Sequence, residues 1–238
     1  LSGSSPYVMK ISVKDGPSGD IQTGVTVGGA LCDLGVVDRT ILAAKVDGAV
    51  VDLSCSLSES SILEPLRFDS AEGREVYRHS STHLMAQAVK ELFPSAQLTI
   101  GPALEDSFYY DFAFERPFTP EDLQRIEERA AEIIKRNLTI TRREFSKQDA
   151  IDFFTSRGEP YKVELIQGFP DGEPITAYTQ GDFVDLCRGP HLPSTGVIGA
   201  IKLLTTGGAY WRGDERNPML QRIYGTSFPT QAEVDAYM

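Results

Sequence analysis

The sequence predicts an α+β protein built from two domains, and three observations support this class. The chain has 238 residues, more than one domain of typical size requires. Up to about residue 68 the pattern consists of short strand-like segments with one helix, and a long helix then opens a region of further helices and strands. We therefore expect a processing or cloning remnant at residues 1–8, domains at 9–68 and 69–226, and the start of a linking helix in 227–238.

The first domain has the pattern of a small β-rich unit. Residues 9–13 alternate between apolar and polar as a strand does, and residues 27–35 predict a short helix. The pair Asp47-Gly48 joins strands at 41–46 and 50–53 in a tight hairpin. Strands around a single helix in a segment of this length are typical of a ubiquitin-like β-grasp fold. The segment contains no histidine and no evident catalytic equipment.

The second domain begins with its longest helix, expected over residues 70–93 after a capping-box spacing of Asp69 and Glu72. Thr119-Pro120 opens an amphipathic helix, and a further helix is expected at 146–157. The long helix should pack on a mostly antiparallel sheet. Strands are predicted at residues 97–100, 107–114, 139–145, 161–166, 175–179, 183–186, 201–205 and 220–224.

Composition and charge exclude several classes of protein. No apolar run approaches the roughly 18 residues that cross a bilayer, and there is no basic-then-apolar leader, so we expect a cytoplasmic protein with no membrane partner. Three widely spaced cysteines do not make a disulfide framework. Because the net charge is −11, contact with a phosphate backbone requires local basic patches. Residues 135–147, with five basic and one acidic side chain, and 188–222, with five and two, provide them.

All three histidines fall into two pairs, His79 with His83 and His191 with Cys187. Four residues apart on a helix, the first two imidazoles share one face about 6 Å apart. One cysteine and three histidines are an acceptable tetrahedral zinc set. Neutral imidazoles could instead position and activate a water, and a histidine pair on a helix can also serve packing alone. Asp185 should share a strand face with Cys187 and could orient an imidazole or hold a substrate amine, although a solvated carboxylate fits the pattern equally well.

Segments rich in glycine and aromatic residues provide candidate substrate contacts. Glycine lets a backbone approach a ligand closely, and an aromatic ring beside an arginine suits stacking on a base. A hairpin turn with core aromatics is the alternative at residues 207–213. The candidates are Gly101, Pro102, Tyr109, Tyr110, Arg188, Trp211 and Arg212.

Seven separated motifs, in order along the chain, resemble one enzyme family. They are HSSTHL (79–84), IGP (100–102), FYYD (108–111), YKV (161–163), VDLCRGPH (184–191), AYWRGD (209–214) and LQRIYG (220–225). Together they resemble the editing domain of the bacterial-type threonyl-tRNA synthetases, and the segment before them looks like the TGS domain of that family. One departure is Thr82, where the family usually has a small alanine, so that packing there should differ.

The resemblance implies hydrolysis of the ester in mischarged seryl-tRNA(Thr), by a second site that rejects the correct product. It implies a pocket formed by His79, His83, Lys162, Asp185, Cys187 and His191. We expect Lys162 and His79 to act at the hydroxyls of the terminal adenosine and on the water, and Asp185 to hold the seryl ammonium group. Cys187 and His191 should shape the wall and orient water, while Tyr109 or Tyr110 contacts the seryl side chain or the adenosine.

The resemblance also bears on cofactors and partners. Related editing domains of alanyl-tRNA synthetases are expected to bind zinc through the same pairs of residues, whereas the threonyl type is expected to work without a cofactor. No ATP-binding motif of an aminoacylation core is present in this sequence. ATP, zinc and homodimer formation are therefore expected only of the full-length ligase, and this piece should be a monomer that does not charge tRNA. The expected partners are tRNA(Thr) and seryl-tRNA. A module that binds tRNA or another partner without catalysis is the rival hypothesis.

Overall fold

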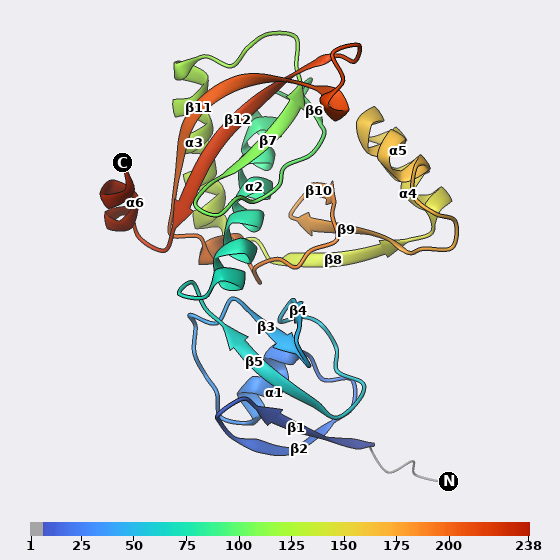
Figure 1. Cartoon of the computed structure of the whole chain (residues 1–238), viewed down its shortest axis with the longest axis vertical. Coiled ribbons are helices and arrows are strands. Elements are labelled where there is room, and N and C mark those ends of the chain that lie inside the picture. The colour runs from blue at the N-terminus through green and yellow to red at the C-terminus, as the bar shows by residue number, and fades with distance from the viewer. Residues whose placement is uncertain (1–6) are drawn as a thin grey trace. The chain divides into compact units, whose positions relative to one another are not determined.

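The structure, a computed structural model that describes residues 7–238, confirms the predicted α+β class (Figure 1). The chain divides into two compact units, one comprising residues up to Val76 together with Gly189–Pro193, the other Tyr77–Arg188 and Ser194–Met238. Of the expected remnant at 1–8, residues 1–6 lie outside the described part, whereas Val8 begins a strand. Among residues 7–238, no helix combines the length and the apolar character that crossing a membrane would need.

The first unit is a mixed sheet with one helix. Its order is β2-β1-β5-β3-β4, in which β1 and β5 run parallel and the other neighbours antiparallel. This is the arrangement expected of a β-grasp unit, and Ile11, Leu31 and Leu63 lie in its core. Asp47 and Gly48 adopt positive φ angles of 49° and 92°, as the predicted hairpin turn requires. The elements are β1 (Val8–Val13), β2 (Ser18–Gln22), α1 (Val27–Asp33), β3 (Ala43–Val46), β4 (Ala49–Val51) and β5 (Ser61–Leu66).

The second unit contains two antiparallel sheets, a larger one of order β11-β12-β7-β6 and a smaller one of order β10-β9-β8. Helix α2 starts in the last residues of the first unit and continues through the second. The elements are α2 (Ala71–Leu92), β6 (Gln97–Leu98), β7 (Phe108–Ala113), α3 (Pro120–Arg136), β8 (Ile140–Phe145), α4 (Lys147–Ser156), α5 (Pro160–Gln167), β9 (Ile175–Gln180), β10 (Phe183–Leu186), β11 (Ala200–Tyr210), β12 (Met219–Phe228) and α6 (Gln231–Tyr237).

The long helix packs on the larger sheet, as predicted. In Figure 1, α2 and α3 lie behind the strands β7, β11 and β12. The Tyr77 hydroxyl on α2 donates a hydrogen bond to the Phe228 carbonyl (2.8 Å), and the Ser81 and Ser227 hydroxyls lie 2.7 Å apart. Helix α3 starts at the predicted N-cap Thr119, where the side chains of Thr119 and Asp122 form a capping box. These contacts fix the face of α2 that points away from the sheet.

The smaller sheet has two different faces. Helices α4 and α5 cover one of them through a core that includes Phe154, Ile166 and Ala177. Because side chains alternate along a strand, residues next to those of the core point to the other face. The register places Arg142, Tyr178 and Asp185 in one row across the three strands, on the face opposite Ala177.

Two local predictions were wrong. Residues 161–166 form helix α5, not a strand. Pro160 occupies the first turn, where its fixed φ and missing N–H suit a helix, and six residues are too few to tell a period of 2 from one of 3.6. At the start of α2, the Ser70 hydroxyl, not Asp69, accepts the hydrogen bond from the Gly73 N–H (3.1 Å). Glu72 instead pairs with Lys45 (2.7 Å).

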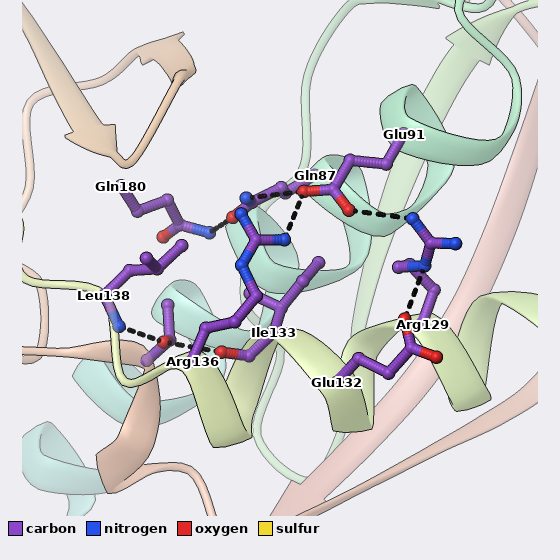
Figure 2. Close-up of polar contacts among 9 residues, drawn as sticks. Gln87, Glu91, Arg129, Glu132, Ile133, Arg136, Leu138 and Gln180 are labelled. Carbon is purple, nitrogen blue, oxygen red and sulfur yellow. Dashed lines mark hydrogen bonds and ion pairs between the residues drawn. The ribbon is translucent and has the colours of Figure 1, made fainter.

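A polar network joins α2 to α3 (Figure 2). The carboxylate of Glu91 on α2 accepts hydrogen bonds from Arg136 (2.8 Å) and Arg129 (3.1 Å) on α3 and from Gln87 (3.0 Å). The Gln87 oxygen in turn accepts a hydrogen bond from Gln180 on β9 (2.8 Å). Burial raises the pKa of Glu91, but the three hydrogen bonds outweigh it and hold the pKa below its ordinary value of 4.5. The network therefore needs an ionised Glu91.

We expect acid to remove the contribution of Glu91 to stability. Because its folded pKa lies below the unfolded one, the contribution is complete above about pH 4.5 and is lost as the pH falls through the folded pKa. Glu91→Gln should cost about 1–2 kcal/mol near neutral pH and much less at about pH 3. Urea unfolding at a series of pH values measures this difference. A constant difference would contradict the charge-based role of Glu91.

Candidate active site

A cavity of about 670 Å³ lies in the second unit. Its wall is formed by residues of α2, β7, β8, α5, β9 and β10 and of the segments that follow β6, α5 and β10. It brings together residues separated by more than 100 positions in the sequence, as an active site does. The predicted site residues that line it are His79, His83, Gly101, Pro102, Tyr110, Lys162, Asp185, Cys187 and Arg188.

Asp185 is the centre of the polar contacts in this cavity. Its Oδ1 forms an ion pair with Lys162 Nζ (2.6 Å), and its Oδ2 accepts a hydrogen bond from the Tyr110 hydroxyl (2.6 Å). The two charged side chains are at most 3% exposed. Oδ1 nevertheless receives no hydrogen bond of regular geometry. Burial, followed by the nearby Asp185, raises the pKa of Tyr110 well above its usual value, so the phenol keeps its proton.

Lys162 reaches the cavity from the first half of α5. Its ammonium group also donates to the Thr99 carbonyl (2.5 Å) beside β6. Glu159, just before α5, accepts a hydrogen bond from the Leu98 N–H (2.7 Å) and pairs with Lys90 (2.8 Å). Lys90 and Glu159 thus hold β6 and α5 together, and with them the Lys162 ammonium group and the Thr99 carbonyl to which it donates.

The imidazoles of α2 lie where the helical spacing predicts. The ring centroids of His79 and His83 are 5.6 Å apart. His79 Nε2 lies 3.2 Å from Cys187 Sγ, and His83 Nε2 lies 3.6 Å from Asp185 Oδ2. Burial lowers the pKa of His83 to about 3, so this imidazole is neutral at physiological pH. The His83 ring is therefore available as a neutral hydrogen-bonding group or ligand.

Thr82, which departs from the family pattern, is accommodated within α2. Its side chain is fully buried, and its hydroxyl donates a hydrogen bond to the His79 carbonyl one turn earlier (2.7 Å). A buried hydroxyl without a partner would be costly, and this bond removes that cost.

The donor set that could hold a metal ion consists of His79, His83, Cys187 and His191. Three histidines and a thiolate suit zinc in chemistry and number. His191 belongs to segment Gly189–Pro193, where its backbone N–H donates to the Asp52 carboxylate (2.5 Å). The residues present therefore fit a zinc ion.

Three of the predicted substrate contacts do not line the cavity. Tyr109 points to the opposite face of β7 from Tyr110, and the guanidinium of Arg222 lies 3.7 Å above its ring. Trp211 is buried, and its indole N–H donates to Glu164 on α5 (3.1 Å). Arg212 forms an ion pair with the same carboxylate (3.0 Å). Both residues thus attach the turn between β11 and β12 to the helix that carries Lys162.

Other lining residues escaped the sequence analysis. Arg142 on β8, Phe169 after α5 and Thr176 on β9 all contribute to the wall. For Arg142 the signal was present, because the alternation along its strand and the pairing with β9 put it on the face of Asp185. For Phe169, in an irregular loop, the sequence holds no comparable signal.

Gly101 allows a close approach of backbone and aromatic ring at the wall. A Cβ atom at this position would lie 2.2 Å from Cδ2 of Tyr110. No real Cβ atom tolerates such a contact, so a side chain here would displace the ring that donates to Asp185. The glycine predicted as a ligand contact therefore also serves the packing of the site.

The arrangement suits addition of water to a substrate that carries an ammonium group. An ionised carboxylate has about four acceptor positions, so Asp185, with Lys162 and Tyr110 as partners, can accept a further hydrogen bond from a cation. The His83 imidazole lies 3.6 Å from this carboxylate and the His79 imidazole contacts the Cys187 thiol, so these groups can orient a water, and the Lys162 ammonium can stabilise developing negative charge.

Comparison with known proteins identifies relatives of this chain. Residues 175–224 match the family described as "Threonyl and Alanyl tRNA synthetase second additional domain". The threonine–tRNA ligase of Acidithiobacillus ferrooxidans is 56% identical over 84% of this chain and 31% of its own length. Those of Symbiobacterium thermophilum and Caldanaerobacter subterraneus are 50% and 48% identical over 97% and 99% of this chain. The chain spans about a third of the length of these relatives and is homologous to threonine–tRNA ligases.

Proposed function

We propose that this chain hydrolyses the ester of seryl-tRNA(Thr) as the editing part of a threonyl-tRNA synthetase. In this proposal residues 9–68 are the TGS domain, 69–226 the editing domain, and 227–238 lead to an aminoacylation core. The buried carboxylate of Asp185 in the cavity wall, held by Lys162 and Tyr110 and able to accept further hydrogen bonds, is the observation that carries the proposal. The homology to threonine–tRNA ligases supports it independently.

The ammonium group of the seryl moiety would bind Asp185. Its partners Lys162 and Tyr110 hold the carboxylate in place, and both lie within 2.6 Å of it. Such anchoring fixes the ester carbonyl relative to His79 and Cys187. Since an ester is already an activated acyl group, a positioned water can hydrolyse it without a covalent intermediate.

Editing at a second site answers a limit on selectivity. One methyl group in a binding pocket contributes only about 1–3 kcal/mol, so a synthetic site for threonine cannot exclude the smaller serine strongly. If the extra methyl of threonine fits poorly in a separate hydrolytic site, the overall selectivity is the product of the selectivities of the synthetic and hydrolytic sites. This cavity would provide the second selection.

The donor set favours a second candidate, zinc-dependent editing. His79, His83, Cys187 and His191 would hold the ion, which when bound would supply a water of lowered pKa. We propose the metal-free form, because the direct contact of His79 Nε2 with Cys187 Sγ (3.2 Å) satisfies two of the donors without a metal.

The test is hydrolysis of seryl-tRNA(Thr) by this chain, with threonyl-tRNA(Thr) as the control substrate. We expect the seryl ester to be cleaved about 100-fold faster, and EDTA to leave the rate unchanged. If EDTA removed a stoichiometric zinc ion from the protein and the activity with it, the metal-free form would be wrong. Raising the protein concentration compensates for weak tRNA binding. If both esters then stayed intact, the non-catalytic binding module would replace this proposal.

A further inference from the structure

The outer wall of the cavity carries positive charge that the hydrolytic chemistry does not use. Arg142 and Arg188 both line the cavity, together with the ring of Phe169. Their side chains are 40% and 81% exposed, in contrast to Lys162 at 3%. The cavity thus changes from a buried ionic end to an exposed mouth that carries two arginines.

Arg142 is held on this side by the sheet itself. It lies in one row with Tyr178 and Asp185, and its backbone is two strand spacings, or about 10 Å, from the backbone of Asp185. Glu144, two residues further on the same face, accepts a hydrogen bond from its guanidinium group (2.5 Å). The position of Arg142 relative to Asp185 is therefore fixed by backbone hydrogen bonds, not by a loop.

Arg188 is placed by the residues that follow β10. It comes directly after Cys187, and its guanidinium lies 5.6 Å from the ring centroid of Phe169. Its ion pair with Glu173 is long, at 4.0 Å, and exposed, so it holds the side chain only weakly. An arginine over an aromatic ring at a cavity mouth offers both a bidentate phosphate contact and a flat surface for a base.

The charge of the whole chain makes this mouth unusual. With a net charge of −11, the protein repels a phosphate backbone at most of its surface. A tRNA ester bound at Asp185 must nevertheless leave the cavity through its mouth as a single strand of nucleotides. Phosphate contacts fix the register of such a strand without reading its sequence.

We propose that Arg142 and Arg188 bind the phosphates of the single-stranded 3′ end of the tRNA, with Phe169 supporting the adjacent base. This rests on the proposed function and names how the same site holds its substrate outside the reacting group. The two arginines act in binding and register, and they do not take part in ester cleavage.

Two uncleavable probes test this assignment. One is 3′-deoxy-3′-(serylamino)adenosine, which lacks phosphates, and the other is the same nucleoside at the end of the trinucleotide CCA. We expect the wild-type chain to bind the trinucleotide more tightly than the nucleoside. The logarithm of this affinity ratio should fall by about 0.7 per phosphate contact for each tenfold rise in salt concentration. Arg142→Gln and Arg188→Gln should each weaken trinucleotide binding about tenfold and leave nucleoside binding unchanged.

Arg143→Gln is the matched control. Arg143 is the next residue on β8 and carries the same charge, but it points to the other face, where it stacks on Phe145 at 4.8 Å. This variant should bind both probes as the wild type does. If the Arg142 and Arg188 variants also bound the trinucleotide normally while the nucleoside still bound, the inference would be wrong and the proposed function intact. If the wild-type chain bound neither the nucleoside nor the trinucleotide, both the inference and the proposed function would be wrong.

Discussion

Replacing Lys162 with methionine is expected to lower the free energy of unfolding by about 3–5 kcal/mol and to lower ester hydrolysis at least 100-fold. The ammonium group is the counter-charge of Asp185 at 2.6 Å, and both side chains are almost completely buried. Methionine keeps most of the apolar stem but leaves the carboxylate without compensation. Urea unfolding followed by circular dichroism measures the stability, and seryl-tRNA(Thr) hydrolysis the activity.

A second variant separates the structural from the catalytic effect. Lys162→Met combined with Asp185→Asn removes both charges and keeps an acceptor for the Tyr110 hydroxyl. Stability should return to within about 1–2 kcal/mol of the wild type, because no buried charge is left alone. Activity should not return, since the carboxylate that would bind the seryl ammonium group is gone. If the Lys162→Met variant unfolded at the same urea concentration as the wild type, the buried ion pair between Lys162 and Asp185 would not form.

Much of the fold could be predicted because the decisive signals were local. A helix start such as Thr119 and a tight turn such as Asp47-Gly48 act through hydrogen bonds and φ angles of a few neighbouring residues. The sequence pattern shows these directly. Helix α5 was assigned wrongly because its eight residues satisfy either period, and the choice depends on burying Lys162 and Ile166 together.

The candidate site was predictable only as far as its spacing was local. A step of four residues along a helix is enough to place two imidazoles side by side, and the ring centroids of His79 and His83 lie 5.6 Å apart as expected. Periodicity alone could not bring Tyr110 or Lys162 to Asp185, because those contacts span 75 and 23 positions and depend on the packing of three elements. The family motifs supplied both residues to the prediction.

Trp211 shows the converse difficulty. A tryptophan between glycines and next to an arginine has the composition of a stacking site, and the sequence left a hairpin with core aromatics as the alternative. In the structure its indole donates to Glu164 and its ring meets Tyr161 at a centroid distance of 5.1 Å. The residue type indicates only that an aromatic ring has a partner here. The tertiary contacts are needed to show that this partner is α5 and not a base.

His79→Gln is expected to lower the rate of seryl-ester hydrolysis by about 100- to 10,000-fold with little change in stability. Its imidazole lies half-buried at the cavity and contacts the Cys187 thiol at 3.2 Å. Glutamine preserves a polar side chain there, so the core of α2 is not disturbed. The measurement is the single-turnover rate with saturating protein, which reports cleavage and not tRNA binding. A variant as fast as the wild type would remove His79 from the reaction.

Cys187→Ala distinguishes the two ways in which His79 could act. If the imidazole orients water without a metal, loss of the thiol removes one neighbour of the ring, and the rate should fall less than tenfold. If both side chains are zinc ligands, each variant should lose the ion and reach a similarly low rate, since a structural or catalytic zinc site rarely survives loss of a ligand. Rate and zinc content measured on the same samples decide the matter: a mild effect without bound zinc supports the metal-free site, and parallel losses of rate and zinc contradict it.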